Sequence, residues 1–270
     1  GVCENLILVA IPMFIFMGTM LEKSGVAKDL LYALQILLRR VPGGLALSVT
    51  IMGTIMAATT GIIGASVVMM TLLALPVMLE RNYDKSLSTG TIAASGTLGI
   101  LIPPSIMLVI MADLLAISVG TLFVASVFPG LLLAVLYFIY LLLRTRLNPK
   151  LAPPLPDNIG PDNVKEKIKL IFKSFLPPIF LIFLVLGSIF AGIATPTEAA
   201  GVGALGSILL AILNKRLNFR ILKEVTERSA LTGAMIFGIF VGATAFSYVF
   251  RSLGGDDLIH HFVNEIGLGP

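Results

Sequence analysis

The sequence predicts an all-α protein that crosses a membrane several times, and two observations predict it. The chain of 270 residues is 57% hydrophobic and only 13% charged, with a mean hydropathy of +0.99. Soluble domains have about half apolar and about a quarter charged residues. The apolar residues also gather into runs of membrane-spanning length, which charged or Pro-rich turns separate.

These runs give the order of the predicted elements. The first span, at residues 6–20, leads through a charged turn to a segment at 30–38 that is too short to cross, and we expect it to be an interfacial helix. Residues 144–173 are polar and Pro-rich, which predicts a linker or a partly disordered connection. Further spans are expected at residues 119–143, 175–193, 198–213 and 229–250, and a short amphipathic piece at 258–266.

Residues 45–79 form an apolar stretch that is too long for one span. Two spans would need about 40 residues, at ~20 each, plus a turn. The stretch is shorter than that, and the polar group Thr59-Thr60-Gly61 interrupts its middle. We therefore expect two half-length helices that meet at a polar tip, a re-entrant hairpin. Two spans with a very tight turn are the alternative.

A block of small and kink-forming residues interrupts the next predicted helical region, at 86–116. Gly96 and Gly99 loosen the backbone, whereas Pro103 and Pro104 remove donors and collide with the preceding turn. Lipid cannot satisfy the freed backbone groups, so the break must be buried in protein or line a wet cavity. Secondary transporters hold ions and substrates at such broken helices.

The basic residues predict the topology, because Lys and Arg favour the cytoplasmic side. If the linker is cytoplasmic, the basic turns near 81–85 and 214–228 lie on the same side and the turn at 191–197 lies outside. With a hairpin or two spans at 45–79, every Lys and Arg except Arg251 is then cytoplasmic. A single crossing at 45–79 would leave Arg39 and Arg40 outside, so the charges exclude it.

An internal similarity predicts inverted repeats. Residues 20–31 and 249–259 each contain the end of a span, a charged turn with glycine and the start of a short amphipathic helix. The topology places the first inside and the second outside, as inverted repeats require. We therefore assign a first repeat to 1–143, a cytoplasmic linker to 144–173 and the start of a second repeat to 174–270. The chain starts inside an apolar run, so we expect a truncated fragment without its second hairpin.

Polar residues of the tip and of the broken helix are the candidate ion- and substrate-binding groups. Hydroxyls and free carbonyls are oxygen donors that suit Na⁺, and half-helix N-termini suit an anion such as a carboxylate. The structural alternative is that these small residues only allow close helix packing. The candidates are Thr59, Thr60, Gly61, Ser66, Ser95, Gly96, Thr97, Gly99, Pro103, Pro104 and Ser105.

Other polar residues have structural interpretations that we favour. Asp113 is a candidate gating or coupling carboxylate, but a position at the outer interface also explains it. The motif Thr195-Pro196-Thr197-Glu198 predicts a capped helix start, with docking of a periplasmic partner as the alternative. His260 and His261 are adjacent and diverge on a helix, so we expect no metal site beyond the Na⁺ ligands and no organic cofactor.

Several motifs resemble one transporter family. The main ones are Asn82-Tyr83-Asp84-Lys85 and the run from Gly90 to Ile106, and supporting motifs lie at residues 10–18, 128–132 and 195–200. In this order, over nearly the whole chain, they resemble the large membrane subunit of TRAP (tripartite ATP-independent periplasmic) transporters of the DctM type. The family's first hairpin maps to about 45–79 and its first broken helix to Ser95–Ser105.

The resemblance implies an elevator-type secondary carrier in the bacterial inner membrane, with Na⁺-driven uptake of an organic acid. It also implies two partners, a small membrane subunit and a periplasmic solute-binding protein that delivers the acid. The tip reads Thr59-Thr60-Gly61 where the family commonly has a Ser-Gly-Ser type, so the individual sodium ligands stay open. We expect Thr60→Ala and Gly96→Leu to weaken Na⁺-dependent uptake by the full-length protein.

Two other functions fit parts of the sequence. A stand-alone symporter of an anion and Na⁺ would need no binding protein. The membrane subunit of an ATP-driven importer would explain Glu198-Ala199-Ala200-Gly201, which resembles the coupling loop of such subunits, but the topology places Glu198 outside. The sequence has no phosphate-binding loop, no histidine in a span that would serve a protease, and basic residues that mark topology rather than nucleic-acid binding.

Overall fold

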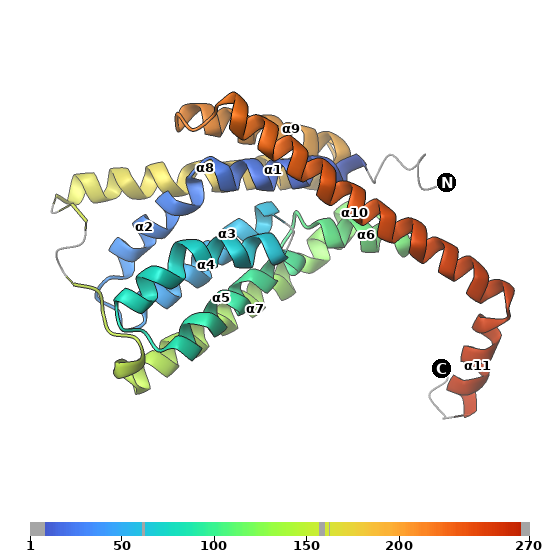
Figure 1. Ribbon diagram of the computed structural model, residues 1–270, viewed down its shortest axis with the longest axis horizontal. Coiled ribbons are helices and arrows are strands. Elements are labelled where there is room, and N and C mark those ends of the chain that lie inside the picture. Colours follow the sequence, from blue (N-terminus) through green and yellow to red (C-terminus); the bar gives the residue numbers. More distant parts are fainter. Residues whose placement is uncertain (1–8, 61–62, 157–159, 162, 266–270) are drawn as a thin grey trace.

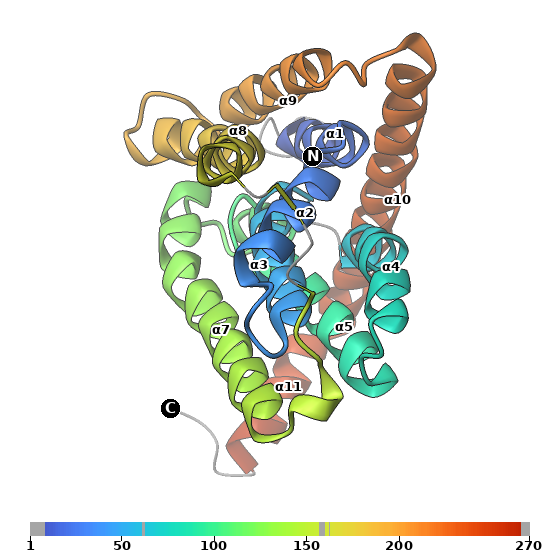
Figure 2. The same cartoon turned by 90° about the vertical axis from the view of Figure 1, so that its left-hand side faces the viewer.

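Two groups of helices pack against each other in the computed structural model, which describes residues 9–60, 63–156, 160–161 and 163–265 (Figure 1). One group consists of α1 (Ala10–Lys23), α8 (Val164–Phe190) and α9 (Pro196–Leu213). The other consists of α3 (Gly44–Thr60), α4 (Ile63–Glu80), α5 (Lys85–Leu101) and α7 (Val119–Leu147). Figure 2 shows the first group above the second, with α2 (Val26–Leu38) between them.

The predicted membrane fold class is confirmed by the lengths of these helices. Among the described residues, α7, α8, α9 and α10 (Phe219–Ser252) are long and apolar enough to cross a membrane. A fifth candidate is the pair formed by α5 and α6 (Ile106–Leu114), which are bent by 42° at a short break. α1 contains the described part of the first predicted span, and no strand occurs in the described ranges.

Helix α10 is longer than the predicted span at 229–250. It begins at Phe219, where the Asn218 side chain accepts a hydrogen bond of 2.7 Å from the Ile221 amide. Ion pairs one turn apart, such as Lys223 with Glu227 at 3.7 Å, stabilise the added turns. A helix of 34 residues is roughly 50 Å long, more than the ~30 Å of the hydrocarbon core, so its charged first turns lie outside that core.

The connection between α7 and α8 is shorter than the linker predicted at residues 144–173, and part of it is ordered. α7 continues to Leu147 and α8 already begins at Val164, because Asn163 caps the helix by accepting from the Lys165 amide. Between them, residues 148–156 form a segment that we call the strap. Its Ala152 and Leu155 are buried, so this part of the linker is packed rather than solvated.

The strap joins three parts of the fold through backbone hydrogen bonds. The Ala152 carbonyl accepts from the Gly43 amide before α3, at 3.0 Å, and the Leu151 carbonyl accepts from the Asp84 amide before α5, at 2.8 Å. The Leu155 amide donates to the Arg39 carbonyl at the end of α2. These bonds bring the basic turns at the ends of α2, α4 and α7 to one end of the molecule (Figure 1).

Tyr83 fixes the same end of the hairpin region. It lies between α4 and α5, is 3% exposed, and its hydroxyl accepts a hydrogen bond of 3.2 Å from the Leu45 amide in the first turn of α3. Burial raises the pKa of Tyr83 to about 12, so the phenol stays protonated at neutral pH. The side chain thereby supplies an acceptor for one of the unpaired amides of the α3 N-terminus.

Candidate ion and substrate site

Helices α3, α4 and α5 form the framework of the predicted site. α3 has 17 residues and α4 has 18, on either side of the predicted tip, and each is roughly 26 Å long. α3 runs in the same direction as α5, since Leu45 meets Tyr83 near the start of both and Gly53 meets Ser95 farther along. The end of α3 and the α5–α6 break therefore lie toward the same end of the framework (Figure 1).

Two glycines permit the close approach of these helices. A Cβ atom on Gly53 would lie 2.7 Å from the Ser95 Cβ, and one on Gly96 would collide with the Val67 side chain. Close packing of α4 and α5 therefore explains why residue 96 is a glycine, which is the structural alternative to an ion-binding role. The predicted loss of uptake for Gly96→Leu does not diagnose an ion site, because leucine would force α4 away from α5.

The break is shorter than the predicted range of Ser95–Ser105. α5 stays helical through Leu101, so Ser95, Gly96, Thr97 and Gly99 are helix residues, and only 102–105 separate α5 from α6. Gly96 is tolerated in α5 because Val67 of α4 packs closely against it, whereas the two prolines end the helix. All four residues of the break, including Pro103 and Pro104, are buried, as expected for a break at membrane depth.

Ser105 is the polar group that the break leaves without a partner. It immediately precedes α6, and its side chain makes no capping hydrogen bond. The residue is 0% exposed, and its hydroxyl oxygen has no hydrogen-bond partner in the described part of the chain. Such a group costs about 1–3 kcal/mol when nothing binds it. A hydroxyl next to the positive N-terminus of α6 offers both a hard oxygen and a helix dipole to a ligand.

Helix α7 covers the break from one side. Its Gly130 has no side chain to hold the helices apart, and a Cβ there would lie 3.0 Å from the Ile102 side chain and 3.1 Å from the Leu101 carbonyl oxygen. The end of α5 is therefore packed against α7 rather than exposed to lipid. This explains the motif at residues 128–132 as a packing contact with the break.

The other described polar candidates lie on helices rather than in the break. Ser95 is buried and donates a hydrogen bond of 3.3 Å to the Thr50 hydroxyl of α3, a residue that the sequence analysis missed although it interrupts an apolar run. Thr97 is exposed and bonds to its own helix at the Ala94 carbonyl. Ser66 is buried on α4. The side chains of Thr59 and Thr60, and all of Gly61, lie outside the described residues.

The capping motif forms the predicted helix start, and Asp113 lies at the end of a helix. Asp113 is half-buried in the last turn of α6, next to the turn that leads to α7. Thr195 accepts from the Glu198 amide, and the Glu198 carboxylate accepts from the Thr195 amide at 2.8 Å, which is a complete capping box at the start of α9. Within the described residues no group of His, Cys, Asp and Glu forms a metal cluster.

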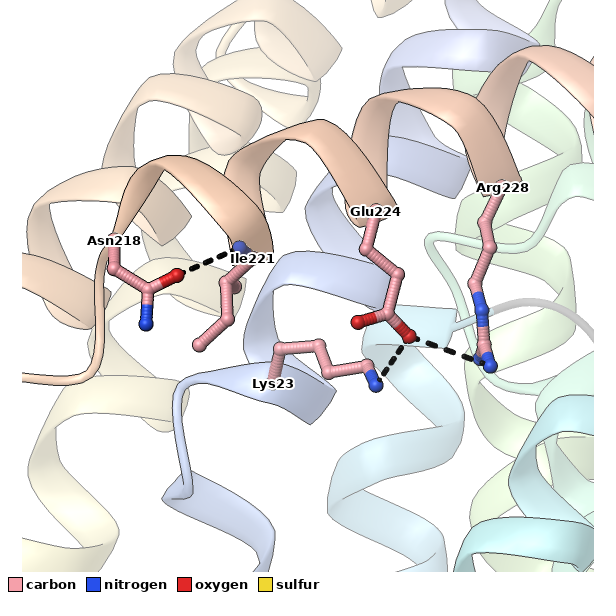
Figure 3. A network of polar contacts seen from close by, with 5 residues as sticks. All are labelled: Lys23, Asn218, Ile221, Glu224 and Arg228. Carbon is pink, nitrogen blue, oxygen red and sulfur yellow. Dashed lines mark hydrogen bonds and ion pairs between the residues drawn. The ribbon is translucent and has the colours of Figure 1, made fainter.

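An ionic cluster at the other end joins the two predicted repeats (Figure 3). The Lys23 ammonium at the end of α1 lies 2.7 Å from the Glu224 carboxylate near the start of α10, and Arg228 lies 3.5 Å from the same carboxylate. The side-chain amide of Asn214 also donates a hydrogen bond of 3.3 Å to the Ser24 carbonyl. The end of α1 thus meets the start of α10, so the two helices run in opposite directions, as inverted repeats would.

The whole chain matches one family of transport proteins. Residues 1–270 match the model of the tripartite ATP-independent periplasmic transporter, DctM component. The chain belongs to this family. The predicted family resemblance is therefore confirmed, and the family description is that of a transporter component rather than an enzyme.

Curated relatives agree with this assignment. The chain is 33% identical over 270 residues to the C4-dicarboxylate TRAP transporter large permease protein DctM of Pseudomonas aeruginosa, covering 99% of this chain and 61% of the relative. It is 31% identical to the isethionate TRAP transporter permease protein DctMQ of Oleidesulfovibrio alaskensis, over 90% of this chain and 37% of that protein. It is 28% identical to the ectoine TRAP transporter large permease protein TeaC of Halomonas elongata, over 90% and 55%. The chain thus spans at most about three fifths of these relatives.

Proposed function

We propose that the full-length protein is the large permease of a Na⁺-driven TRAP carrier that takes up an organic acid across the bacterial inner membrane. The observation that supports this most is the buried Ser105 hydroxyl at the break between α5 and α6, which has no hydrogen-bond partner among the described residues. A hard oxygen at the N-terminus of a half-helix suits either a sodium ion or the carboxylate that accompanies it. The family membership and the relatives named for C4-dicarboxylate and isethionate support an organic acid as the cargo.

The proposed site combines the break with the hairpin tip. The tip residues Thr59, Thr60 and Gly61 would face the break, and Ser105 with the first amides of α6 would supply the opposite wall. The second, inverted hairpin of the full-length protein would complete the site from the other side. The α3–α5 framework would then move with its cargo as one body, the motion of an elevator carrier.

The proposed partners are a small membrane subunit and a periplasmic solute-binding protein. The family description names a tripartite periplasmic transporter, which supports a system of three components. The binding protein would determine which acid reaches the permease. A thermal-shift screen of the cognate binding protein against a panel of organic acids, including succinate and isethionate, identifies the solute.

Uptake by proteoliposomes that contain the full-length permease and the small subunit tests the function. We expect uptake of the identified acid only when an inward Na⁺ gradient and the loaded binding protein are both present. Uptake without the binding protein would favour a stand-alone symporter instead. Uptake that needs ATP, with a cysteine at position 198 labelled only from the cytoplasm, would favour the membrane subunit of an ATP-driven importer.

A further inference from the structure

A cleft lies between α5 and α7, beside the first half of α5 and not at the break that follows this helix. The cleft has a volume of about 200 Å³. Its lining includes Thr50 of α3 and Leu151 of the strap. One water takes about 30 Å³ in the liquid, so the cleft is large enough for a small polar group rather than a single water. Its polar lining consists of Thr50, Asp84, Ser86, Thr91, Ser95, Tyr137, Tyr140 and Arg144.

One acid and one base line the cleft without pairing. Asp84 precedes α5 and accepts a hydrogen bond of 2.8 Å from the Leu87 amide. Arg144 is exposed in the last turns of α7. In the part of the chain that the structure describes, the two side chains form no ion pair with each other, and the Arg144 guanidinium has no acidic partner. The cleft therefore offers a negative and a positive group to the same ligand.

The Thr91 hydroxyl is a second group in the cleft that a ligand could bind. The residue lines the cleft and is 5% exposed, and its hydroxyl is buried with no hydrogen-bond partner among the described residues. A buried hydroxyl in this state is destabilising unless a ligand or water bonds to it. The hydroxyls of Thr50 and Ser95, which bond to each other, lie in the same lining.

The flank of the cleft has the character of a membrane surface. On α7, Leu136, Ile139 and Leu143 are 52%, 44% and 55% exposed and leave an apolar face next to the cleft. Tyr140 and Arg144 lie near the C-terminal end of α7, which the basic residues predict to be on the cytoplasmic side. Tyrosine and arginine at the end of a span mark the depth of the lipid headgroups. An acyl chain can therefore cover α7 while its headgroup enters the cleft.

We propose that this cleft binds the headgroup of a zwitterionic phospholipid, phosphatidylethanolamine. The phosphate would pair with Arg144 and the ammonium with Asp84, while Thr91 would bond to a headgroup oxygen. Charge complementarity selects this lipid, because a purely anionic headgroup would meet the Asp84 carboxylate and a choline headgroup has no N–H to donate to it. A bound lipid would fill the space between α5 and α7 at the base of the framework.

Lipid retention by the purified full-length protein tests the proposal. The protein is exchanged into mixed micelles with equal amounts of phosphatidylethanolamine, phosphatidylglycerol and phosphatidylcholine, and bound lipid is counted by native mass spectrometry. We expect phosphatidylethanolamine to be retained preferentially. Arg144→Gln and Asp84→Asn should each lower its retention about tenfold, because each removes one charge-assisted contact. Asparagine also caps helices, so Asp84→Asn keeps the start of α5.

Two further variants distinguish lipid bound in the cleft from lipid adsorbed elsewhere on the protein. Arg146→Gln removes an exposed base of α7 that does not line the cleft, and it should leave retention unchanged. Thr91→Val should lower retention while keeping the fold. Equal retention by the Arg144→Gln and Arg146→Gln variants would overturn the proposal, as would preferential retention of phosphatidylglycerol. Displacement of the lipid by millimolar succinate or inorganic phosphate would also overturn it, in favour of a site for soluble anions. None of these measurements depends on transport.

Discussion

Two helix–turn–helix units of this chain have the same turn conformation but differ in how deeply the neighbouring helices bury them. The first is α1, the turn at Gly25, and α2; the second is α10, the turn at Gly254, and α11 (Gly255–Glu265). Both glycines are left-handed, with φ of 79° and 77°. In both turns the residue before the glycine donates its amide to the carbonyl four residues earlier, and the glycine carbonyl accepts from four residues later.

The surroundings of the two units are very different. Leu30 and Leu34 of α2 are 0% and 1% exposed under α3 and α8, whereas Leu258 of α11 is 71% exposed. The first turn is also bound to the start of α10 through Lys23 and Glu224, but the second has a local contact between Arg251 and Asp256 at 3.5 Å. The turn therefore forms with or without tertiary contacts, so the local sequence encodes it and packing determines only its stability.

The largest predicted difference between the units comes from their apolar side chains. Leu34→Ala should lower the unfolding free energy of the full-length protein by about 3 kcal/mol, because it leaves a cavity between α2 and its neighbours. Leu258→Ala should cost less than about 0.5 kcal/mol in the same experiment, as expected for an exposed residue. Thermal unfolding in detergent measures both. Equal losses would mean that α11 is as deeply packed as α2 in the full-length protein.

The two turn glycines should behave alike. Gly25→Ala and Gly254→Ala each place a Cβ in the left-handed region, at about 1–2 kcal/mol. Neither meets a steric clash, since the nearest side-chain atom to a Cβ on Gly25 is 3.6 Å away and nothing lies within 4 Å at Gly254. Hydrogen exchange of the amides after each turn should therefore accelerate by a similar factor. A much larger effect at Gly25 would show that packing, not the local backbone, determines the turn.

The ionic contacts should differ least. Glu224→Gln removes the partner of both Lys23 and Arg228, and we expect only a small loss of stability that fades with added salt. Arg251→Gln, at an exposed pair, should have no measurable effect. Melting temperatures are compared at 20 mM and 500 mM NaCl, roughly below and above physiological ionic strength, because added salt screens exposed charges. A salt-independent loss for Glu224→Gln would contradict a screened surface interaction.

Structural features that depend only on neighbouring residues were predictable from the sequence. The apolar runs, the capping box at Thr195 and the turn glycines depend on neighbouring residues, and the structure has them where they were expected. The position of the break was predicted only approximately. The sequence shows that Gly96, Gly99 and the two prolines disfavour a helix, but only the contact of Gly96 with Val67 explains why α5 continues past the glycines.

Features that depend on long-range contacts were missed. The strap is polar and Pro-rich in sequence, and its order comes from backbone bonds to Gly43, Asp84 and Arg39, which no local pattern reveals. The pairing of Ser95 with Thr50 and the cleft between α5 and α7 also join distant segments. The spacing of four between Thr91 and Ser95 places both on one face of α5, and this was the available signal for the cleft.

The Na⁺ dependence of uptake by a Ser105→Ala variant tests the central claim most directly. Initial uptake rates are measured in proteoliposomes of the full-length protein over a range of external Na⁺ concentrations, with Ser126→Ala as the matched control, because the buried Ser126 hydroxyl already donates to the Phe123 carbonyl. We predict that Ser105→Ala raises the half-saturating Na⁺ concentration about tenfold, as loss of one ion ligand would, and that Ser126→Ala does not. Identical Na⁺ dependence in wild type and both variants would contradict an ion site at the α5–α6 break.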